Sequence, residues 1–177
     1  MEKEREKGKN IALIGFMGVG KSAVSRRLKA LLSMEEMETD AMVAEAEGME
    51  IGDIFAKYGE EYFRRRERDI IQSLENRRGV IISCGGGAVM REENVRNLKK
   101  SSRIVLLTAE PETILERVKH SQERPLLNGH MNVEYIGELM EKRREKYEAA
   151  ADLIVSTDKK TVNQVCEELI QRLRETD

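Results

Sequence analysis

Short apolar runs alternate with amphipathic stretches along this chain. Residues 11–14, 80–83 and 104–108 are mostly branched aliphatic, and residues 153–155 form a shorter run of the same kind. Continuous apolar runs of this length are typical of strands buried on both faces, and strands that alternate with helices predict a parallel sheet. A fifth strand near residues 34–37 completes the alternation, although its composition is largely polar. The pattern predicts an α/β fold with three layers, α/β/α, around a five-stranded parallel sheet.

The stretches between these runs have helical spacing of their apolar residues. A helix that begins at Lys21 would bury one face formed by Val24, Leu28, Leu31 and Leu32. Pro111 suits the first turn of another helix, after the third apolar run. A late helix would bury the stripe Val162, Val165, Cys166, Leu169, Ile170 and Leu173. These helices are expected to cover the sheet.

Two segments do not fit the simple alternation. Residues 48–74 are long, and Phe63, Ile70, Ile71 and Leu74 would share one helical face there. Residues 121–132 are polar and irregular, and a loop of that length in a compact domain is usually functional or disordered.

Length and composition restrict the class of protein. The 177 residues favour a single domain, and 31 basic against 33 acidic residues give a net charge of -2, which argues against a nucleic-acid surface. No apolar run approaches a membrane helix, and the charged start of the chain lacks a signal peptide, so we expect a cytoplasmic protein. Cys84 and Cys166 lie far apart in the sequence and are expected to be reduced, packed thiols.

One motif carries chemistry on its own. Residues 15–22 read Gly-Phe-Met-Gly-Val-Gly-Lys-Ser and match G-x-x-x-x-G-K-[ST], the phosphate-binding P-loop. Its glycines let backbone N–H groups surround a phosphate, Lys21 can reach the β- and γ-phosphates, and Ser22 can coordinate Mg²⁺. A plain glycine-rich turn is the alternative. The apolar run before the motif and the amphipathic stretch after it favour nucleotide binding.

The rest of the chain does not fit a switch GTPase or a motor ATPase. Such proteins commonly end an apolar strand in a magnesium-binding Asp, but residues 80–83 lead into Cys84 and three glycines. The guanine-binding Asn-Lys-x-Asp sequence is absent, and residues 157–160, Thr-Asp-Lys-Lys, are only a faint echo of it. The motif therefore belongs to another class of nucleotide-binding protein.

Four further segments make the chain resemble the shikimate kinase family, in the nucleoside-monophosphate-kinase-like group of P-loop enzymes. They are Glu38-Thr39-Asp40, Tyr58-Gly59-Glu60 with Phe63-Arg64-Arg65-Arg66-Glu67, Gly85-Gly86-Gly87-Ala88-Val89, and Arg124-Pro125-Leu126-Leu127 with Arg143 and Tyr147 beyond it. The resemblance runs from about residue 9 to residue 173. It implies one kinase domain over residues 1–177, with a helical substrate-binding insert at about 41–70 and a lid at about 121–132.

The resemblance implies ATP-dependent phosphorylation of the 3-hydroxyl of shikimate, a small cyclohexene carboxylate. Arg64 and Arg143 would hold the carboxylate, since planar guanidinium groups bind carboxylates through paired hydrogen bonds. The backbone of Gly86 and Gly87 would line the ring site. Asp40 would hold the ring hydroxyls and orient the attacking oxygen or accept its proton.

The resemblance also assigns the nucleotide side. Lys21, Asp40 and Arg124 would be the catalytic residues, with Arg124 delivered by the lid to the transferred phosphoryl group. Arg117 would flank the adenine. Mg²⁺ would bind Ser22 and, through water, Glu38, which stands where the family usually has Asp. The ATP site as a whole would comprise Gly18, Val19, Gly20, Lys21, Ser22, Ala23, Arg117 and Arg124.

Each assignment has a simpler alternative. Residues 64–66 could be a solvated helix face, the glycine triplet a turn, and Glu38 and Asp40 surface carboxylates. Arg124 could lie in a passive loop, and His120 and His130 lack a third partner for a metal. The order and spacing of all five segments together favour the kinase.

Three hypotheses follow for the function. The first is a monomeric shikimate kinase whose ligands are ATP, Mg²⁺ and shikimate, without nucleic acid or membrane. The second keeps the fold and changes the acceptor to a gluconate-like acid or a nucleoside monophosphate. The third is a nucleotide-binding module without turnover, which the complete set of Lys21, Asp40 and Arg124 disfavours.

Overall fold

The computed structural model describes residues 8–119 and 132–176. Its centre is a five-stranded parallel sheet with the strand order β2-β3-β1-β4-β5. The strands are β1 Asn10–Ile14, β2 Glu35–Glu38, β3 Val80–Ser83, β4 Ser102–Thr108 and β5 Leu153–Ser156. The predicted sheet is confirmed, including the polar strand for which the composition was weak support.

The position of each strand in the sheet explains its composition. β1 is the middle strand and all five of its residues are buried, as are the four residues of β3. β2, with the sequence Glu-Glu-Met-Glu, lies at an edge of the sheet and has no buried residue. Charged side chains on an edge strand discourage pairing with another chain. The polar composition of β2 therefore suits its place.

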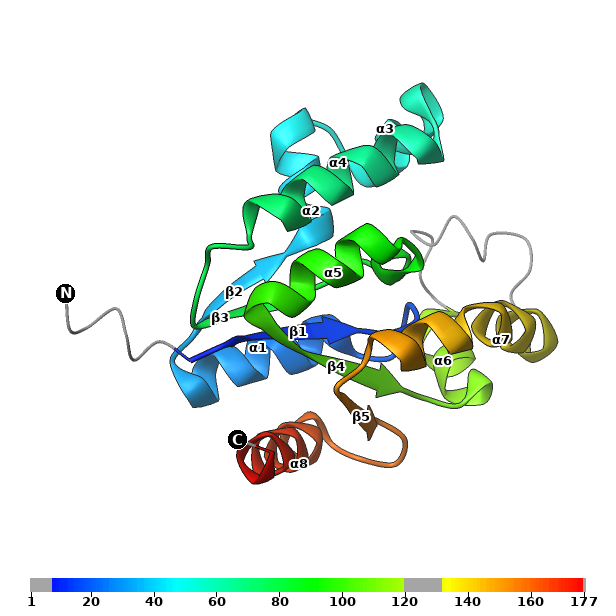
Figure 1. The fold of residues 1–177 in the computed structure, drawn as a ribbon. Coiled ribbons are helices and arrows are strands. Elements are labelled where there is room, and N and C mark those ends of the chain that lie inside the picture. The colour runs from blue at the N-terminus through cyan, green and yellow to red at the C-terminus, as the bar shows by residue number, and fades with distance from the viewer. Residues whose placement is uncertain (1–7, 120–131, 177) are drawn as a thin grey trace.

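Helices cover both faces of this sheet. α1 Lys21–Leu32 and α8 Val162–Glu175 pack against each other on one face, and α5 Glu92–Ser101 lies on the other (Figure 1). α6 Pro111–Val118 and α7 Val133–Ala150 contact each other, and α7 also packs on the short 3-10 helix Ala88–Met90. In the described part of the chain, no helix is both long and apolar enough to cross a bilayer.

The predicted apolar stripes are correct except at two positions. Val24 and Leu28 of α1 are buried, whereas Leu31 near the end of that helix is 43% exposed. Val162, the first residue of α8, is 40% exposed, because the buried part of the stripe begins at Val165. Side chains at helix ends project past the layer they cover, so periodicity alone overextends the stripe. Cys84 and Cys166 are both buried free thiols, as expected.

The segment between β2 and β3 consists of α2 Thr39–Glu47, α3 Ile51–Tyr58 and α4 Glu60–Ser73. Gly59, whose φ of 84° favours glycine, separates α3 from α4, and the predicted face from Phe63 to Leu74 lies on α4 and its C-cap. The face also divides between two hydrophobic clusters. Phe63 packs with Val43 and Ile54 in a small cluster of the three helices, while Ile71 joins the main core.

The parallel topology brings the candidate functional segments together. The P-loop follows β1, Glu38 ends β2 and the glycine triplet begins after β3 and Cys84. β1, β2 and β3 are neighbours in the sheet, and parallel strands place their carboxyl ends at one edge. Segments that are far apart in the sequence therefore meet at one place.

Candidate active site

The phosphate-binding loop is held between β1 and α6. Gly18 has a φ of 81°, and a Cβ atom added there would lie 2.8 Å from Cγ1 of Val118 in α6. Only glycine fits this conformation and this close approach. The ammonium of Lys21 donates to the carbonyl oxygens of Gly15 at 2.6 Å and Phe16 at 3.1 Å, so its charge lies over the loop. Its predicted contact with the β- and γ-phosphates stays a prediction.

A pocket of about 290 Å³ forms where the P-loop, the acidic element and the glycine triplet meet. Its lining includes Lys21, Ser22, Glu38, Asp40, Gly85, Gly86 and Arg117. A Cβ on Gly86 would lie 3.6 Å from the backbone nitrogen of Met17, so the two loops touch. Thr39 fixes the third segment, because its hydroxyl accepts from the backbone N–H of Gly85 at 3.0 Å. The structure thus assembles in one pocket residues predicted for phosphate, metal and acceptor.

Cys84 also lines this pocket, as a protonated thiol and not as a reactive thiolate. Its side chain is 2% exposed, and burial raises its pKa to about 12. Nearby Glu67 raises that pKa further, while Lys21 opposes the shift. A thiol that stays protonated at neutral pH is a poor nucleophile. The chemistry of the pocket therefore belongs to its lysine and carboxylates.

A second hollow, beside the first, is lined by Arg64 from α4 and Arg143 from α7. Both guanidinium groups approach the glycine triplet. A Cβ on Gly87 would lie 2.4 Å from Nη2 of Arg64, and one on Gly86 would lie 3.6 Å from Nη1 of Arg143. Nη1 of Arg143 is buried and has no hydrogen-bond partner among the described residues. Two predicted substrate-binding arginines thus converge, and Nη1 of Arg143 could donate a hydrogen bond to a ligand.

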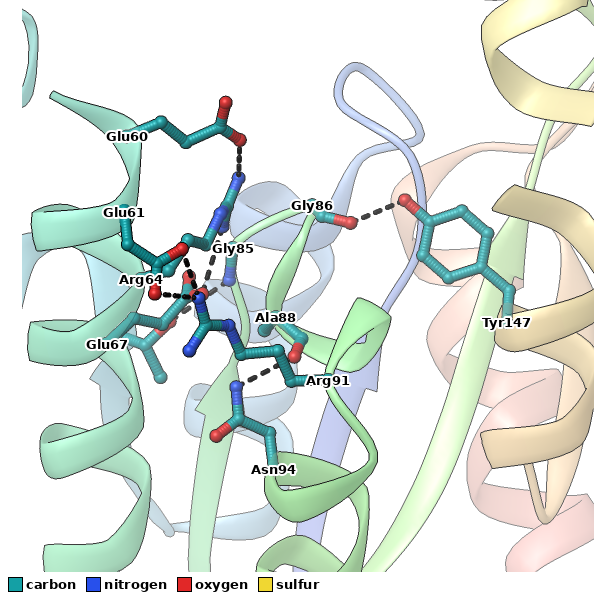
Figure 2. Close-up of polar contacts among 11 residues, drawn as sticks. Glu60, Glu61, Arg64, Glu67, Gly85, Gly86, Ala88, Arg91, Asn94 and Tyr147 are labelled. Atoms are coloured by element: carbon teal, nitrogen blue, oxygen red, sulfur yellow. Dashed lines mark hydrogen bonds and ion pairs between the residues drawn. The ribbon is translucent and has the colours of Figure 1, made fainter. Parts of the chain in front are cut away.

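Glu67 holds Arg64 in this position, and the sequence analysis gave Glu67 no role. Its side chain is 0% exposed, and its Oε1 accepts from Nη1 of Arg64 at 2.9 Å (Figure 2). Its other oxygen, Oε2, is buried without a hydrogen-bond partner within the described ranges. Burial raises the pKa of Glu67, the charge of Asp40 adds to that rise, and Arg64 opposes it. The Glu of the Phe-Arg-Arg-Arg-Glu motif was the signal available in the sequence.

Tyr147 fixes the glycine triplet from the opposite side. Its hydroxyl donates to the carbonyl oxygen of Gly86 at 2.5 Å, as Figure 2 shows, and burial raises its pKa. The N–H and C=O of a trans peptide point in opposite directions, so this bond also orients the N–H of Gly87. The amide of Asn94 donates to the carbonyl of Ala88 at 2.8 Å and steadies the next turn. Backbone groups that the sequence analysis placed at the ring site are therefore held rigidly.

Arg117 contacts the P-loop itself. Its Nη1 donates to the carbonyl oxygens of Gly18 at 3.1 Å and Val19 at 3.0 Å. Its predicted place beside the adenine stays a prediction. Arg124, His120, His130 and nearly all of the predicted lid lie outside the described residues.

The pocket is suited to Mg²⁺. The hydroxyl of Ser22 and the carboxylates of Glu38 and Asp40 line it together, and Mg²⁺ prefers oxygen ligands. Within residues 8–119 and 132–176, no group of three or more His, Cys, Asp or Glu side chains is close enough to hold an ion alone. Mg²⁺ usually binds one or two protein oxygens together with phosphates and water. These donors fit that mode of binding.

The fold and the site together define a class of protein. A P-loop at the end of the central strand, an acidic residue beside it and a separate acceptor site within reach of the loop are the parts of a phosphotransferase. We therefore place the chain among the P-loop kinases that act on small molecules.

Comparison with known proteins identifies the family: residues 17–174 match the model of the shikimate kinase family, and the chain belongs to it. A shikimate kinase of Dehalococcoides mccartyi is 41% identical over 166 residues, which cover 94% of each chain. The solved shikimate kinase of Acinetobacter baumannii, in complex with shikimate, has a TM-score of 0.92 and 29% identity, covering 100% of this chain and 99% of that one. The Aquifex aeolicus enzyme has a TM-score of 0.82 and 36% identity, covering 94% and 97%.

The fold alone extends further than the family. A gluconokinase of Sinorhizobium meliloti has a TM-score of 0.62 at 18% identity, covering 96% of this chain and 95% of that one. That similarity is one of architecture. It gives no information about the acceptor.

Proposed function

We propose that this chain is an ATP-dependent shikimate kinase, which transfers the γ-phosphoryl group of ATP to the 3-hydroxyl of shikimate. One observation carries the choice of acceptor: Arg64 and Arg143, from two different helices, converge on Gly86 and Gly87 beside the P-loop. Two such guanidinium groups can together bind a small carboxylate. Family membership supports the same acceptor.

The acceptor is held by charge and shape. Arg64 and Arg143 bind the carboxylate, because a guanidinium offers two parallel N–H donors and does not lose its charge. Glu67 keeps Arg64 aimed at the site. The backbone of Gly86 and Gly87 lies against the ring, and a side chain on Gly87 would displace the Arg64 guanidinium.

The transfer itself depends on groups that line the other half of the site. Asp40 orients the attacking hydroxyl and accepts its proton, while Lys21 and Arg124 stabilise the charge on the phosphoryl oxygens. Ser22, and Glu38 through water, would hold Mg²⁺, whose charge offsets that of the β- and γ-phosphates. A Glu reaches one methylene further than the usual Asp, so Glu38 can serve with a small shift.

The wider expectations from the sequence belong to the same proposal. They are a single domain with the insert at about 41–70 and the lid at about 121–132, a monomer, and action in the cytoplasm on free small molecules without nucleic acid or membrane. The near-neutral charge of the chain supports the absence of nucleic acid. Of the predicted insert, the described helices α2, α3 and α4 span residues 39–73.

A panel of acceptors tests the assignment. Release of ADP is measured in a coupled assay with ATP, Mg²⁺ and either shikimate, gluconate or a nucleoside monophosphate. We expect shikimate to be phosphorylated at least about a hundredfold faster than the others. A nucleoside monophosphate presents no carboxylate to Arg64 and Arg143, and gluconate, which does, is an open chain that must lose several bond rotations to bring a hydroxyl to the phosphate. Lys21→Met should abolish turnover, while Lys29→Met, exposed on the same helix, should not.

Two results would overturn the proposal. A faster rate with gluconate or a nucleotide than with shikimate would show that the acceptor is wrong. ADP release that is the same with and without every acceptor would instead favour a nucleotide-binding module.

A further inference from the structure

The P-loop motif does not show which groups donate hydrogen bonds to the carbonyl oxygens of the loop. A loop that turns N–H groups toward a phosphate turns the opposite ends of the same peptides away from it. Carbonyl oxygens turned into the protein need donors. Val19 is 1% exposed, and the carbonyl of its peptide with Gly20 faces Arg117 and Thr157. Two side chains from elsewhere in the chain therefore complete the loop.

Thr157 lies where three elements meet. It directly follows β5, is 3% exposed, and its N–H donates to the carbonyl of Thr108 at 2.8 Å, which extends the sheet by one residue. Its hydroxyl oxygen is 2.9 Å from the carbonyl oxygen of Val19 and 3.1 Å from that of Thr108. The same oxygen accepts from Nη1 of Arg117 at 3.0 Å. The end of the sheet thereby holds both the loop and the arginine.

The contacts of Arg117 give the hydroxyl a second role. Nη1 of Arg117 also donates to the carbonyls of Gly18 and Val19, and its Nη2 donates to the backbone carbonyl of Thr157 at 3.3 Å. The guanidinium is thus held between the loop and Thr157. A cation fixed there adds positive charge beside the phosphate site, and it does not line the hollow of Arg64 and Arg143.

We infer that Thr157 is a positioning residue for the nucleotide: its hydroxyl holds the Val19 carbonyl, so that the N–H of Gly20 faces the phosphate, and it holds Arg117 against the loop. This inference rests on the proposed nucleotide-dependent function. It adds to that function a residue outside the P-loop motif and outside the predicted ATP-binding set. Its effect should fall on the nucleotide and spare shikimate.

Calorimetric titration with ADP tests the inference without any acceptor. Thr157→Val keeps the shape of the side chain but removes the hydroxyl, and Thr157→Ser keeps the hydroxyl. We expect Thr157→Val to weaken ADP binding about tenfold and to raise KM for ATP similarly, because one to two hydrogen bonds are lost. KM for shikimate should change less than about twofold, and Thr157→Ser should bind ADP within about twofold of the wild type.

Ser101→Ala is the matched control. Ser101 is 3% exposed and its hydroxyl also has a partner, the amide of Asn10 at 3.3 Å, but it lies at the amino end of β4, away from the carboxyl ends of the strands and the P-loop. Removing this hydroxyl should lower the melting temperature without changing ADP affinity. If Thr157→Val does not fold, Thr157→Ala replaces it, because alanine leaves no methyl group against the carbonyls.

The possible outcomes separate clearly. Folded Thr157→Val or Thr157→Ala with unchanged ADP affinity would overturn the inference, as would Thr157→Ser that binds ADP as weakly as either. Equal increases in KM for ATP and shikimate would indicate a general structural role and overturn it as well. Weakened ADP binding in an enzyme that does not phosphorylate shikimate would support the inference and reject only the proposed acceptor.

Discussion

At the scale of single residues, the proposed acceptor side of the site includes arginines paired with carboxylates. Arg64 has two acidic neighbours, at 2.9 Å to Glu67 and 3.5 Å to Glu60. Glu60 is largely exposed, so water screens its pairing and weakens it. Glu67 is buried, and breaking its pairing would leave an uncompensated carboxylate. The direction of the Arg64 guanidinium is therefore decided by Glu67.

The carboxylate clamp can be tested by truncating each arginine. Arg64→Ala and Arg143→Ala should each weaken shikimate binding at least about tenfold and change ATP binding less than about threefold, because a charge-assisted hydrogen bond is worth roughly 1.5–3 kcal/mol. Titration calorimetry with each ligand measures both effects.

Arg68→Ala is the control for removing a positive charge from α4. Arg68 pairs with neighbouring Asp69 at 3.0 Å, so its loss should affect neither ligand. Parallel losses of ATP and shikimate affinity in the two clamp variants would argue against a carboxylate clamp. Arg143→Ala is the clearer test, because Arg64→Ala also leaves Glu67 unpaired.

At the scale of elements, close packing of backbone and side chain shapes the acceptor site. Gly87 has a φ of -98°, a conformation open to any residue. Its lack of a side chain is needed because the Arg64 guanidinium occupies the place of a Cβ atom. The triplet is thus a surface against which α4 and α7 can bring their arginines.

Gly87→Ala should therefore damage acceptor binding without straining the backbone. We expect KM for shikimate to rise about tenfold, since the methyl group displaces Arg64, while KM for ATP stays nearly constant. Gly52→Ala in α3 is the control: a Cβ there contacts nothing within 4 Å, and the variant should be more stable by roughly 0.5–1 kcal/mol. Steady-state kinetics and urea unfolding measure the two effects. An unchanged KM for shikimate in Gly87→Ala would show that Arg64 is free to move aside.

The elements also show what a sequence can predict. β1, β3 and β4 were evident because strands buried on both faces need continuous apolar runs. The sequence signal for β2 was weak because an edge strand can be polar. In the candidate site, residues could be proposed from motifs, but the contacts that orient them could not: Glu67 and Tyr147 were named only as members of motifs, without a role. Thr157 acts on Val19 from 138 positions away. Single-sequence patterns carry no information on such pairs, since a threonine after any strand looks the same.

At the scale of the whole molecule, the buried carboxylate of Glu67 is expected to lower the free energy of unfolding. The sheet and most helices share one large hydrophobic cluster, whereas α2, α3 and α4 have a small one of their own. Glu67 lies on α4, fully buried, with one oxygen unpaired among the residues described. Unsatisfied buried carboxylates destabilise a fold. The site is therefore expected to lower the stability of the protein.

The dependence of the unfolding free energy on pH tests whether the buried Glu67 carboxylate destabilises the fold. The pKa of Glu67 is raised above its ordinary 4.5, so the native state keeps a proton that the unfolded chain has released. The unfolding free energy of the wild type should therefore rise relative to that of Glu67→Gln as pH falls from 7 toward 4.5, and the difference should level off below 4.5. Urea unfolding across this range measures it, with Glu45→Gln, exposed on α2, as the control. A difference that stays constant or shrinks would mean that Arg64 fully compensates the buried charge.

The contact between the P-loop and the glycine triplet has a consequence for ligand design. Gly86 lies against the backbone of Gly15 and Met17, so the two halves of the proposed site share a wall of backbone. A compound that joins an adenosine polyphosphate to a shikimate-like carboxylate needs only a short, stiff linker to occupy both halves. Tethering makes the second binding event intramolecular, so such a bivalent inhibitor would bind far more tightly than either half alone. Its acceptor half would be held by Arg64 and Arg143, which lie outside the P-loop motif.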